Sequence, residues 1–330
     1  MNPKHHVRAV ITAHVHEANI HTMTLHAPEV ARDAKPGQFV MVYLDKGEHL
    51  LPRPISIYDV DRHKGEITLV YAAIGAGTDV MSKWQVGHNP RILGALGNGF
   101  DLDDIQENIH KNIHKNMRGN TQKNIPKSDT VALVGGGLGA APLFFLAKEL
   151  RRLGVSLDIF LGFRTEALAL SKPFEPLAQN LYVATEDGSG QTKKGYVTDF
   201  LIQKNDTHTL TDNTSGSLTQ TSSNDSLTQT SSNDSLTQTS SSDLTQTSSS
   251  GHASTATYAA ILACGPTPML KILSAYAREQ NIPCQVSVEE RMACGLGACK
   301  GCVVRTLVGY QLCCLVGPVF DSKEVQFDAK

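Results

Sequence analysis

Short apolar or alternating runs fill the first hundred residues, separated mainly by Pro, Gly, Asp and Lys. Alternation is typical of half-buried strands, and runs this short favour strands over helices. Strands at this spacing predict a small antiparallel barrel over residues 1–102. A helical pattern occurs in this part only at residues 79–84. The predicted strands include residues 7–11, 23–25, 39–44 and 67–71.

The pattern changes at residue 130, where apolar runs begin to alternate with helical ones. This alternation is typical of a parallel sheet, so we expect an α/β lobe over residues 130–283. Its first strand ends in a glycine turn followed by a helix, a unit that lets the phosphates of a dinucleotide approach the backbone. The glycines are Gly135, Gly136, Gly137 and Gly139. The predicted elements are strands at 130–134, 156–164, 181–185 and 258–263 and helices at 143–153 and 269–280.

Two segments lack such a pattern. Residues 103–129 are polar and repeat Asn-Ile-His-Lys at 108–111 and 112–115, which favours a linker between domains. Residues 206–257 are rich in Ser, Thr and Gln, and the unit at 217–225 recurs at 226–234. One apolar residue per repeat cannot bury a core, so we expect a disordered insert at about 205–256 rather than a β-solenoid.

The composition excludes several classes of function. At 330 residues the chain has room for two domains and a small appendage. Its net charge of −2 provides no basic face for nucleic acid or a membrane surface. No run reaches the ~18 apolar residues of a spanning helix, and the N-terminus does not resemble a signal peptide. Seven cysteines, four of them in one arrangement, indicate a reducing compartment, so we expect a cytoplasmic protein.

A cysteine motif near the C-terminus carries the strongest chemical signal. Cys294, Cys299 and Cys302 have C-x4-C-x2-C spacing with glycines between them, and the pair Cys313-Cys314 follows. This is the plant-type 2Fe-2S pattern, in which a loop wraps the cluster and a fourth cysteine returns from elsewhere. A structural zinc site is the alternative, but its second half would be two adjacent cysteines, which make a poor knuckle.

Weaker signals lie upstream. In Arg53-Pro54-Ile55-Ser56 the guanidinium suits a pyrophosphate and the hydroxyl suits a flavin edge. Gly75-Ala76-Gly77-Thr78 precedes the helical pattern that begins at Asp79, where backbone amides can bind an anion.

Two other residue types have both a functional and a structural interpretation. Cys264 ends a predicted strand, where open α/β sheets bind ligands, although an isolated cysteine is more often a buried small hydrophobe. The six histidines between His5 and His26 are spaced irregularly on predicted strands without carboxylate partners, so we interpret them as surface residues rather than metal ligands.

In this order, Arg-Pro-x-Ser, Gly-x-Gly-Thr, the glycine turn and Ala-Cys-Gly-Pro resemble the ferredoxin–NAD(P) reductase superfamily. Residues 289–295 and Gly-Pro-Val-Phe at 317–320 narrow the resemblance to the electron-transfer subunits of class 1B dihydroorotate dehydrogenase. The resemblance covers the chain outside the segments at about 103–128 and 205–256. It implies a flavin-binding antiparallel barrel, a Rossmann-like parallel-sheet NAD lobe and a small 2Fe-2S domain over residues 284–330.

The resemblance also implies the site residues. The glycines of the turn would bind NAD. Cys264 would be the catalytic residue, near the nicotinamide, where hydride passes to or from the flavin. The family's last cysteine precedes Gly-Pro-Val-Phe by three residues, which selects Cys314 as the fourth ligand beside Cys294, Cys299 and Cys302. The residues implied for FAD are Arg53, Pro54, Ile55, Ser56, Val70, Tyr71, Ala72, Gly77 and Thr78.

The implied activity is electron transfer. A separate FMN-containing catalytic subunit oxidises dihydroorotate in de novo pyrimidine (UMP) biosynthesis, and electrons pass through the 2Fe-2S cluster to FAD and then to NAD+. The expected assembly is a heterotetramer of two plus two subunits. Two alternatives remain: a related reductase that serves a hydrogenase or ferredoxin partner, and a zinc-stabilised flavoprotein scaffold.

Overall fold

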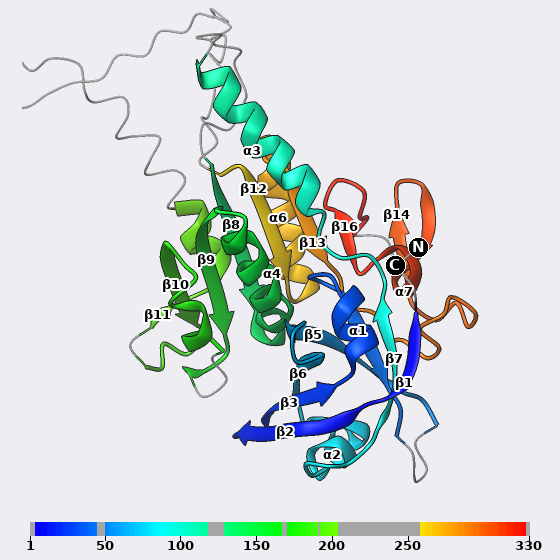
Figure 1. Ribbon diagram of the computed structural model, residues 1–330. Coiled ribbons are helices and arrows are strands. Elements are labelled where there is room, and N and C mark those ends of the chain that lie inside the picture. Colours follow the sequence, from blue (N-terminus) through cyan, green and yellow to red (C-terminus); the bar gives the residue numbers. More distant parts are fainter. Residues whose placement is uncertain are drawn as a thin grey trace, which may run out of the picture.

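The computed structural model describes residues 4–44, 50–117, 129–166, 170–190, 192–203 and 258–327. The predicted insert at 205–256 and residues 118–128 of the predicted linker lie outside the described residues. The rest forms a barrel, an α/β lobe beside it and a C-terminal segment that contacts both (Figure 1). No described helix is long and apolar enough to cross a membrane.

The barrel is an antiparallel sheet with the strand order β1-β7-β4-β5-β6-β3-β2. β1 pairs with β7 at one edge and β2 pairs with β3 at the other. Only Ala9 separates β1 from β2, so one continuous stretch joins both edges and curls the sheet. The predicted antiparallel barrel is confirmed. Its strands are β1 His5–Arg8, β2 Val10–Glu17, β3 Ile20–His26, β4 Phe39–Val42, β5 Arg53–Asp61, β6 Glu66–Ala72 and β7 Arg91–Leu96.

Two short helices accompany the barrel strands. Helix α2 spans Ala76–Ser82, so it begins before the predicted start at Asp79 and places Gly77 and Thr78 inside its first turn. Helix α1, Pro28–Asp33, was not predicted. Its six residues are too few for a helical period to emerge, and it is held by the burial of Val30 and Ala31.

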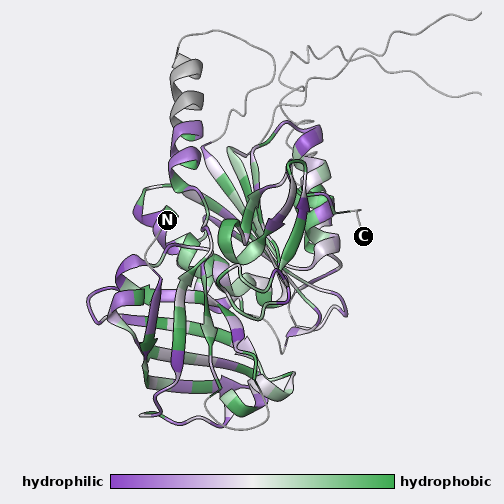
Figure 2. Ribbon diagram, turned by 90° about the vertical axis from the view of Figure 1, so that its right-hand side faces the viewer, coloured by the Kyte–Doolittle hydropathy of each residue, from purple (hydrophilic) through white to green (hydrophobic). Residues whose placement is uncertain are grey.

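The α/β lobe contains the sheet β11-β10-β9-β8-β12-β13-β16. All neighbouring strands are parallel except β16, which runs antiparallel to β13, so the parallel sheet is confirmed with one antiparallel edge. Its central strands are hydrophobic along their length, whereas the barrel strands alternate (Figure 2). The strands are β8 Thr130–Gly136, β9 Ser156–Phe163, β10 Asn180–Thr185, β11 Lys193–Lys194, β12 Ala260–Cys264, β13 Cys284–Ser287 and β16 Val319–Asp321.

Helices cover both faces of this sheet. Val131 and Leu133 of β8 pack with helix α4, Ala140–Arg152, while the alternate residues Ala132 and Val134 pack in the cluster that contains α6, Thr267–Glu279. Because successive residues of a strand point to opposite faces, α4 and α6 lie on opposite sides. The short helices are η1 Gly137–Gly139 and η3 Lys172–Phe174.

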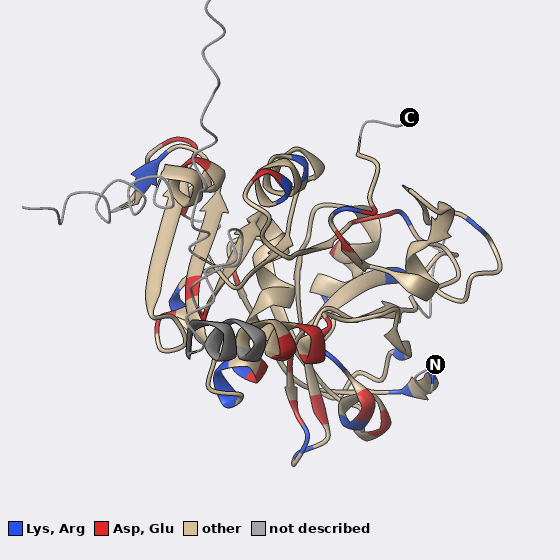
Figure 3. Ribbon diagram, turned by 90° about the horizontal axis from the view of Figure 1, so that it is seen from above, with Lys and Arg blue, Asp and Glu red and all other residues tan. Residues whose placement is uncertain are grey.

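The first part of the predicted polar linker is a helix. Helix α3 spans Leu102–Met117, and Ile105 is buried against the α/β lobe with Leu102 and Ile109 beside it. This spacing gives one apolar stripe in a polar sequence, which packing converts into a helix. The acidic residues of its first turns are visible in Figure 3, and the Asp104 N–H donates to the Asp101 carboxylate at 3.0 Å.

The C-terminal segment is joined to the α/β lobe rather than separate from it. We expected a cluster domain to begin at residue 284, but β13 is a strand of the lobe's sheet. The chain then leaves the sheet, forms the hairpin β14 Val303–Thr306 and β15 Gly309–Leu312 and the helical turn α7 Cys313–Val316, and returns as β16. The cysteine segment, residues 288–318, is therefore anchored at both ends by the sheet.

Candidate functional site

Four cysteines of the cysteine segment come together although they arise from a loop, a strand start and a helical turn. Positive φ angles of 68° at Gly295 and 81° at Gly297 bend the loop around Cys294. The Cys294 Sγ accepts the N–H groups of Leu296 at 3.3 Å and Cys299 at 3.4 Å. Such donors stabilise a thiolate, which is the form that binds metal.

The four thiols form two neighbouring pairs. The Cys299 N–H donates to the Cys294 Sγ and the Cys314 N–H donates to the Cys302 Sγ, each at 3.4 Å, and Cys314 also lies within electrostatic reach of Cys294. Burial raises the pKa of Cys294, but the backbone N–H groups outweigh burial and lower that pKa to about 6. Burial and the contact with Cys302 raise the pKa of Cys314 to about 12.

This arrangement fits a two-iron cluster. Each iron of a 2Fe-2S cluster takes two thiolates, and the segment offers two adjacent pairs. In the described ranges, no three His, Cys, Asp or Glu side chains surround a single point closely enough to hold one ion. The Cys313 Sγ lies instead 3.9 Å from the Val288 carbonyl, in the core, and burial raises its pKa. The geometry therefore favours Cys314 over its neighbour.

The structure brings Arg53 and the turn at Gly77 together. A Cβ atom on Gly77 would overlap the guanidinium of Arg53, so this side chain lies flat on the backbone of α2. Its Nη1 donates to the Leu51 carbonyl at 2.6 Å. Thr78 fixes the turn, because its Oγ1 accepts the Gly75 N–H at 3.1 Å. A cation is thus positioned beside the first turn of α2.

Val70 and Ala72 face the α/β lobe, whereas Tyr71 does not. Val70 and Ala72 pack with Ala141 of α4, at the junction of barrel and lobe. The side chain of Tyr71 points to the other face of β6, is 3% exposed and is hydrogen-bonded to His14. Only its backbone is therefore on the junction side. Ile55, another residue implied for FAD, is buried in the barrel core.

Residues that the sequence analysis missed join the barrel to the lobe. The Tyr58 ring stacks on Phe144 of α4 with 4.5 Å between centroids. One turn further along α4, Lys148 binds both carboxylate oxygens of Asp59 at 2.6 and 2.8 Å. The i, i+4 spacing of Phe144 and Lys148 places them on one helix face, but nothing in the sequence indicates partners in the barrel.

Cys264 and the glycine turn meet at the point where the strand order of the lobe reverses. From β8 the chain continues to β9 on one side and later to β12 on the other, and Cys264 pairs in register with Gly135. Open α/β sheets bind ligands at the carboxyl ends of such strands. Burial, with a smaller contribution from the charge of Glu289, raises the pKa of Cys264 to about 12, so the side chain is a neutral thiol.

We expect Gly139→Ala to destabilise the protein, because Gly139 packs directly against the end of β12. A Cβ atom there would overlap the Cys264 carbonyl and the Gly265 Cα, both backbone groups that cannot turn away. Overpacking of this kind costs about 1–3 kcal/mol. Urea unfolding followed by circular dichroism measures the loss, and an unchanged midpoint would show that the turn and β12 are not in contact.

The comparisons with known proteins agree with this geometry. Residues 289–326 match the family model of the iron-sulfur cluster binding domain of dihydroorotate dehydrogenase B. The chain is 31% identical over 309 residues to the dihydroorotate dehydrogenase B (NAD(+)) electron transfer subunit of Shouchella clausii, covering 92% of this chain and 91% of the relative. It is 33% identical to the subunit of the same name from Lysinibacillus sphaericus, with 93% of each chain covered.

Solved structures share the fold. The structure of an NADH-dependent reduced ferredoxin-NADP oxidoreductase matches with a TM-score of 0.67 at 24% identity, over 97% of this chain and 90% of that one. A ferredoxin NADP+ reductase from Neisseria gonorrhoeae, solved with FAD and NADP, matches with a TM-score of 0.52 at 12% identity, over 84% and 91%. The predicted reductase-like fold is confirmed.

Proposed function

The chain belongs to the family of dihydroorotate dehydrogenase B (NAD(+)) electron transfer subunits, and on this premise we propose that it passes electrons from a catalytic subunit to NAD+. The catalytic subunit would contain FMN and oxidise dihydroorotate in pyrimidine biosynthesis. The observation that carries the proposal is that one chain contains both two neighbouring pairs of cysteines and a strand–turn–helix unit at the point where the strand order of its parallel sheet reverses.

Cys294, Cys299, Cys302 and Cys314 would hold a 2Fe-2S cluster. Cys299 is exposed while Cys302 and Cys314 are buried, so one side of the cluster would face outward and the other would face the protein. This asymmetry suits a carrier that receives electrons at the surface and delivers them inward. Backbone N–H donors and burial would together set the potential of such a cluster.

FAD would lie at the junction of barrel and lobe. Arg53 would bind its pyrophosphate, and Ser56 and the backbone of Val70–Ala72 would line it, with Gly77 and Thr78 at the turn. When bound, a flavin converts single-electron steps into hydride transfer. Pro54 and Ile55 would hold Arg53 and Ser56 in place on β5. The stacked Tyr58 and Phe144 rings and the Asp59–Lys148 ion pair would hold the barrel and the α/β lobe in a fixed relative position.

NAD+ would bind over the carboxyl ends of β8 and β12. The turn Gly135, Gly136, Gly137 and Gly139 would receive its phosphates. A Cβ atom on Gly137 would meet open space, so the backbone there would be accessible, whereas the other three glycines would let the turn pack closely against its neighbours. Cys264 would form a small neutral wall near the nicotinamide. With its pKa at about 12 it would not act as a thiolate nucleophile.

The catalytic subunit would dock beside the cluster. Leu296, Leu315 and Val316 are 49%, 36% and 40% exposed, and all three lie within two residues of a cluster cysteine. Exposed apolar side chains that lie close together are typical of the core of an interface. We propose that two copies of this chain assemble with two catalytic subunits, and that the complex is cytoplasmic, in keeping with seven free thiols.

We also propose the functional division of the chain. An FAD barrel would cover residues 1–102, a polar segment 103–129, an NAD lobe 130–283 with an insert at about 205–256, and a cluster domain 284–330. The strands β13 and β16 mean that the last two units would move as one body.

Reconstitution with candidate partners tests this function. With a dihydroorotate-oxidising FMN subunit, we expect dihydroorotate to drive NAD+ reduction that depends on the present chain. The related alternative is a reductase that serves a hydrogenase or a ferredoxin. Stable assembly and electron transfer with one of those partners, but none with the dihydroorotate-oxidising subunit, would overturn the proposal.

A further inference from the structure

Three histidines and a tyrosine, His14, His16, His21 and Tyr71, form a cluster on the barrel. The histidines belong to none of the sites described above. Only the backbone of Tyr71 belongs to the proposed FAD site, because its side chain points toward the histidines and away from that site. His16 of β2 pairs directly with His21 of β3, and His21 pairs with Tyr71 of β6. His14 lies two residues before His16, on the same face of β2. We expected these histidines on the surface, but His21 is only 6% exposed.

The hydrogen bonds of His14 fix which of its nitrogens carries a lone pair. Its Nδ1 lies 2.8 Å from the carbonyl oxygen of Trp84, and a carbonyl can only accept, so Nδ1 carries the hydrogen. In the neutral ring the Nε2 then holds the lone pair. That lone pair faces both the His21 Nδ1 and the Tyr71 hydroxyl, each at 3.2 Å. A single lone pair cannot accept a full hydrogen bond from both.

The distance between the two nitrogens suits a shared metal ion. Two nitrogens that bind a tetrahedral Zn²⁺ at 2.0–2.1 Å lie about 3.3 Å apart. His14 Nε2 and His21 Nδ1 are 3.2 Å apart. The Trp84 carbonyl accepts the hydrogen bond of the other nitrogen of His14, and a backbone carbonyl is one of the partners that orient metal-binding histidines. Two ligand positions and one outer partner are therefore preset.

The third nitrogen is not in place. Across the described part of the chain, no three His, Cys, Asp or Glu side chains stand around one point. His16 is exposed and its ring centroid lies 5.2 Å from that of His21, so it can rotate about its side-chain bonds without disturbing the core. Two histidines at i and i+2 on one strand and a third across the ladder then approach the ion from one face of the sheet.

We propose that His14, His16 and His21 bind a divalent transition metal ion. His14 and His21 are already in place as ligands, and the His16 side chain rotates to become the third ligand. The site has imidazole ligands and no carboxylate, which favours Zn²⁺, Cu²⁺ or Ni²⁺ over Mg²⁺ or Ca²⁺. Zn²⁺ matches the nitrogen spacing.

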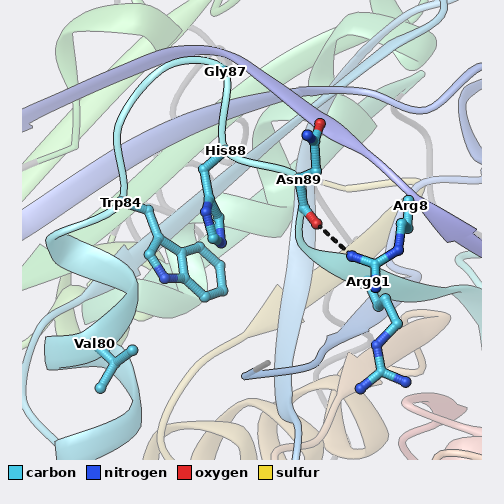
Figure 4. Close-up of a pocket in the computed structure, with 7 residues that line it drawn as sticks. All are labelled: Arg8, Val80, Trp84, Gly87, His88, Asn89 and Arg91. Atoms are coloured by element: carbon cyan, nitrogen blue, oxygen red, sulfur yellow. Dashed lines mark hydrogen bonds between the residues drawn. The ribbon is translucent and has the colours of Figure 1, made fainter. Parts of the chain in front are cut away.

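Trp84, whose carbonyl contacts His14, lies two residues after the end of α2. Its ring lies 4.7 Å from that of His88, and both line a pocket of about 670 Å³ with Arg8, Asn89 and Arg91 (Figure 4). This packing holds the Trp84 carbonyl toward His14. Because Val70 and Ala72 point to the opposite face of β6 from Tyr71, a metal ion at the histidines would not occupy the proposed FAD site.

Zinc titration of the full-length protein with its cofactors bound tests the proposal, with a chromophoric chelator as competitor. We expect the wild type to bind one Zn²⁺ per chain that His14→Gln loses, and His16→Asn to bind it at least about tenfold more weakly. His63→Asn is the matched control, because His63 is an exposed barrel histidine outside the cluster. The thiols are the same in all four proteins, so their contribution cancels.

His14→Gln could unfold the barrel, and for this reason the exposed His16 carries equal weight. Far-UV circular dichroism identifies the variants that are folded. X-ray absorption of the bound zinc should show the scattering of imidazole rings. Wild-type stoichiometry and affinity in a folded His16→Asn variant, or sulfur-only coordination, would overturn the proposal.

Discussion

Cys299→Ser will abolish dihydroorotate-driven NAD+ reduction by the reconstituted complex while FAD remains bound. An alcohol is a much weaker ligand to the iron of such a cluster than a thiolate because it deprotonates far less readily, so we expect the cluster to be lost and the rate to fall by at least about a hundredfold. Oxidation of NADH by an artificial dye should persist, because that route needs only FAD and NAD. Iron, acid-labile sulfide and flavin content, measured on one preparation, separate these effects.

Cys313→Ser is the matched control. Cys313 adjoins Cys314, but its sulfur lies by the Val288 carbonyl rather than in either thiol pair. This variant should keep its iron and most of its activity. Equal loss of iron in both variants, or loss of FAD in Cys299→Ser, would contradict the assignment of separate cluster and flavin sites.

Gly77→Ala will weaken FAD binding as strongly as the loss of Arg53 itself. The added methyl group would take the space of the guanidinium, which therefore has to leave its position. Charge-assisted hydrogen bonds to a phosphate contribute about 1.5–3 kcal/mol, so we expect FAD affinity to fall by roughly ten- to a hundredfold. Titration of the apoprotein with FAD, followed by the quenching of flavin fluorescence, measures this loss.

Gly75→Ala tests whether the effect is specific. Gly75 adopts a φ of −130°, which any residue tolerates, and the nearest atom to its Cβ position is the Thr78 Oγ1 at 4.0 Å. We expect wild-type FAD affinity for this variant and an intermediate value for Arg53→Lys, which keeps the charge but loses the planar fork. Wild-type affinity in Gly77→Ala would remove Arg53 from the proposed FAD site.

The chemistry of local motifs was predictable from the sequence. The cysteine spacing and its glycines specify a loop, because three sulfurs within nine residues leave few backbone paths. The strand–turn–helix unit after residue 130 was equally local. In both cases the residues that act together are near one another in the chain, so their pattern is visible without the fold.

Features made by distant residues were not predictable. The ion pair between Asp59 and Lys148 joins positions 89 residues apart, and no sequence signal pairs them. The histidines on β2 and β3 looked irregular because their spacing has meaning only once the register of the hairpin is known. Helix α3 looked like a linker because its described apolar stripe, Leu102, Ile105 and Ile109, is short and lies in a polar sequence.

Anaerobic reduction of the isolated subunit by NADH, followed by electron paramagnetic resonance, tests the central claim most directly. If NAD, FAD and the cluster form one path in this chain, NADH alone will produce the signal of a reduced 2Fe-2S cluster, with roughly one unpaired electron per chain. A flavin that bleaches with NADH while no iron–sulfur signal develops would contradict the account.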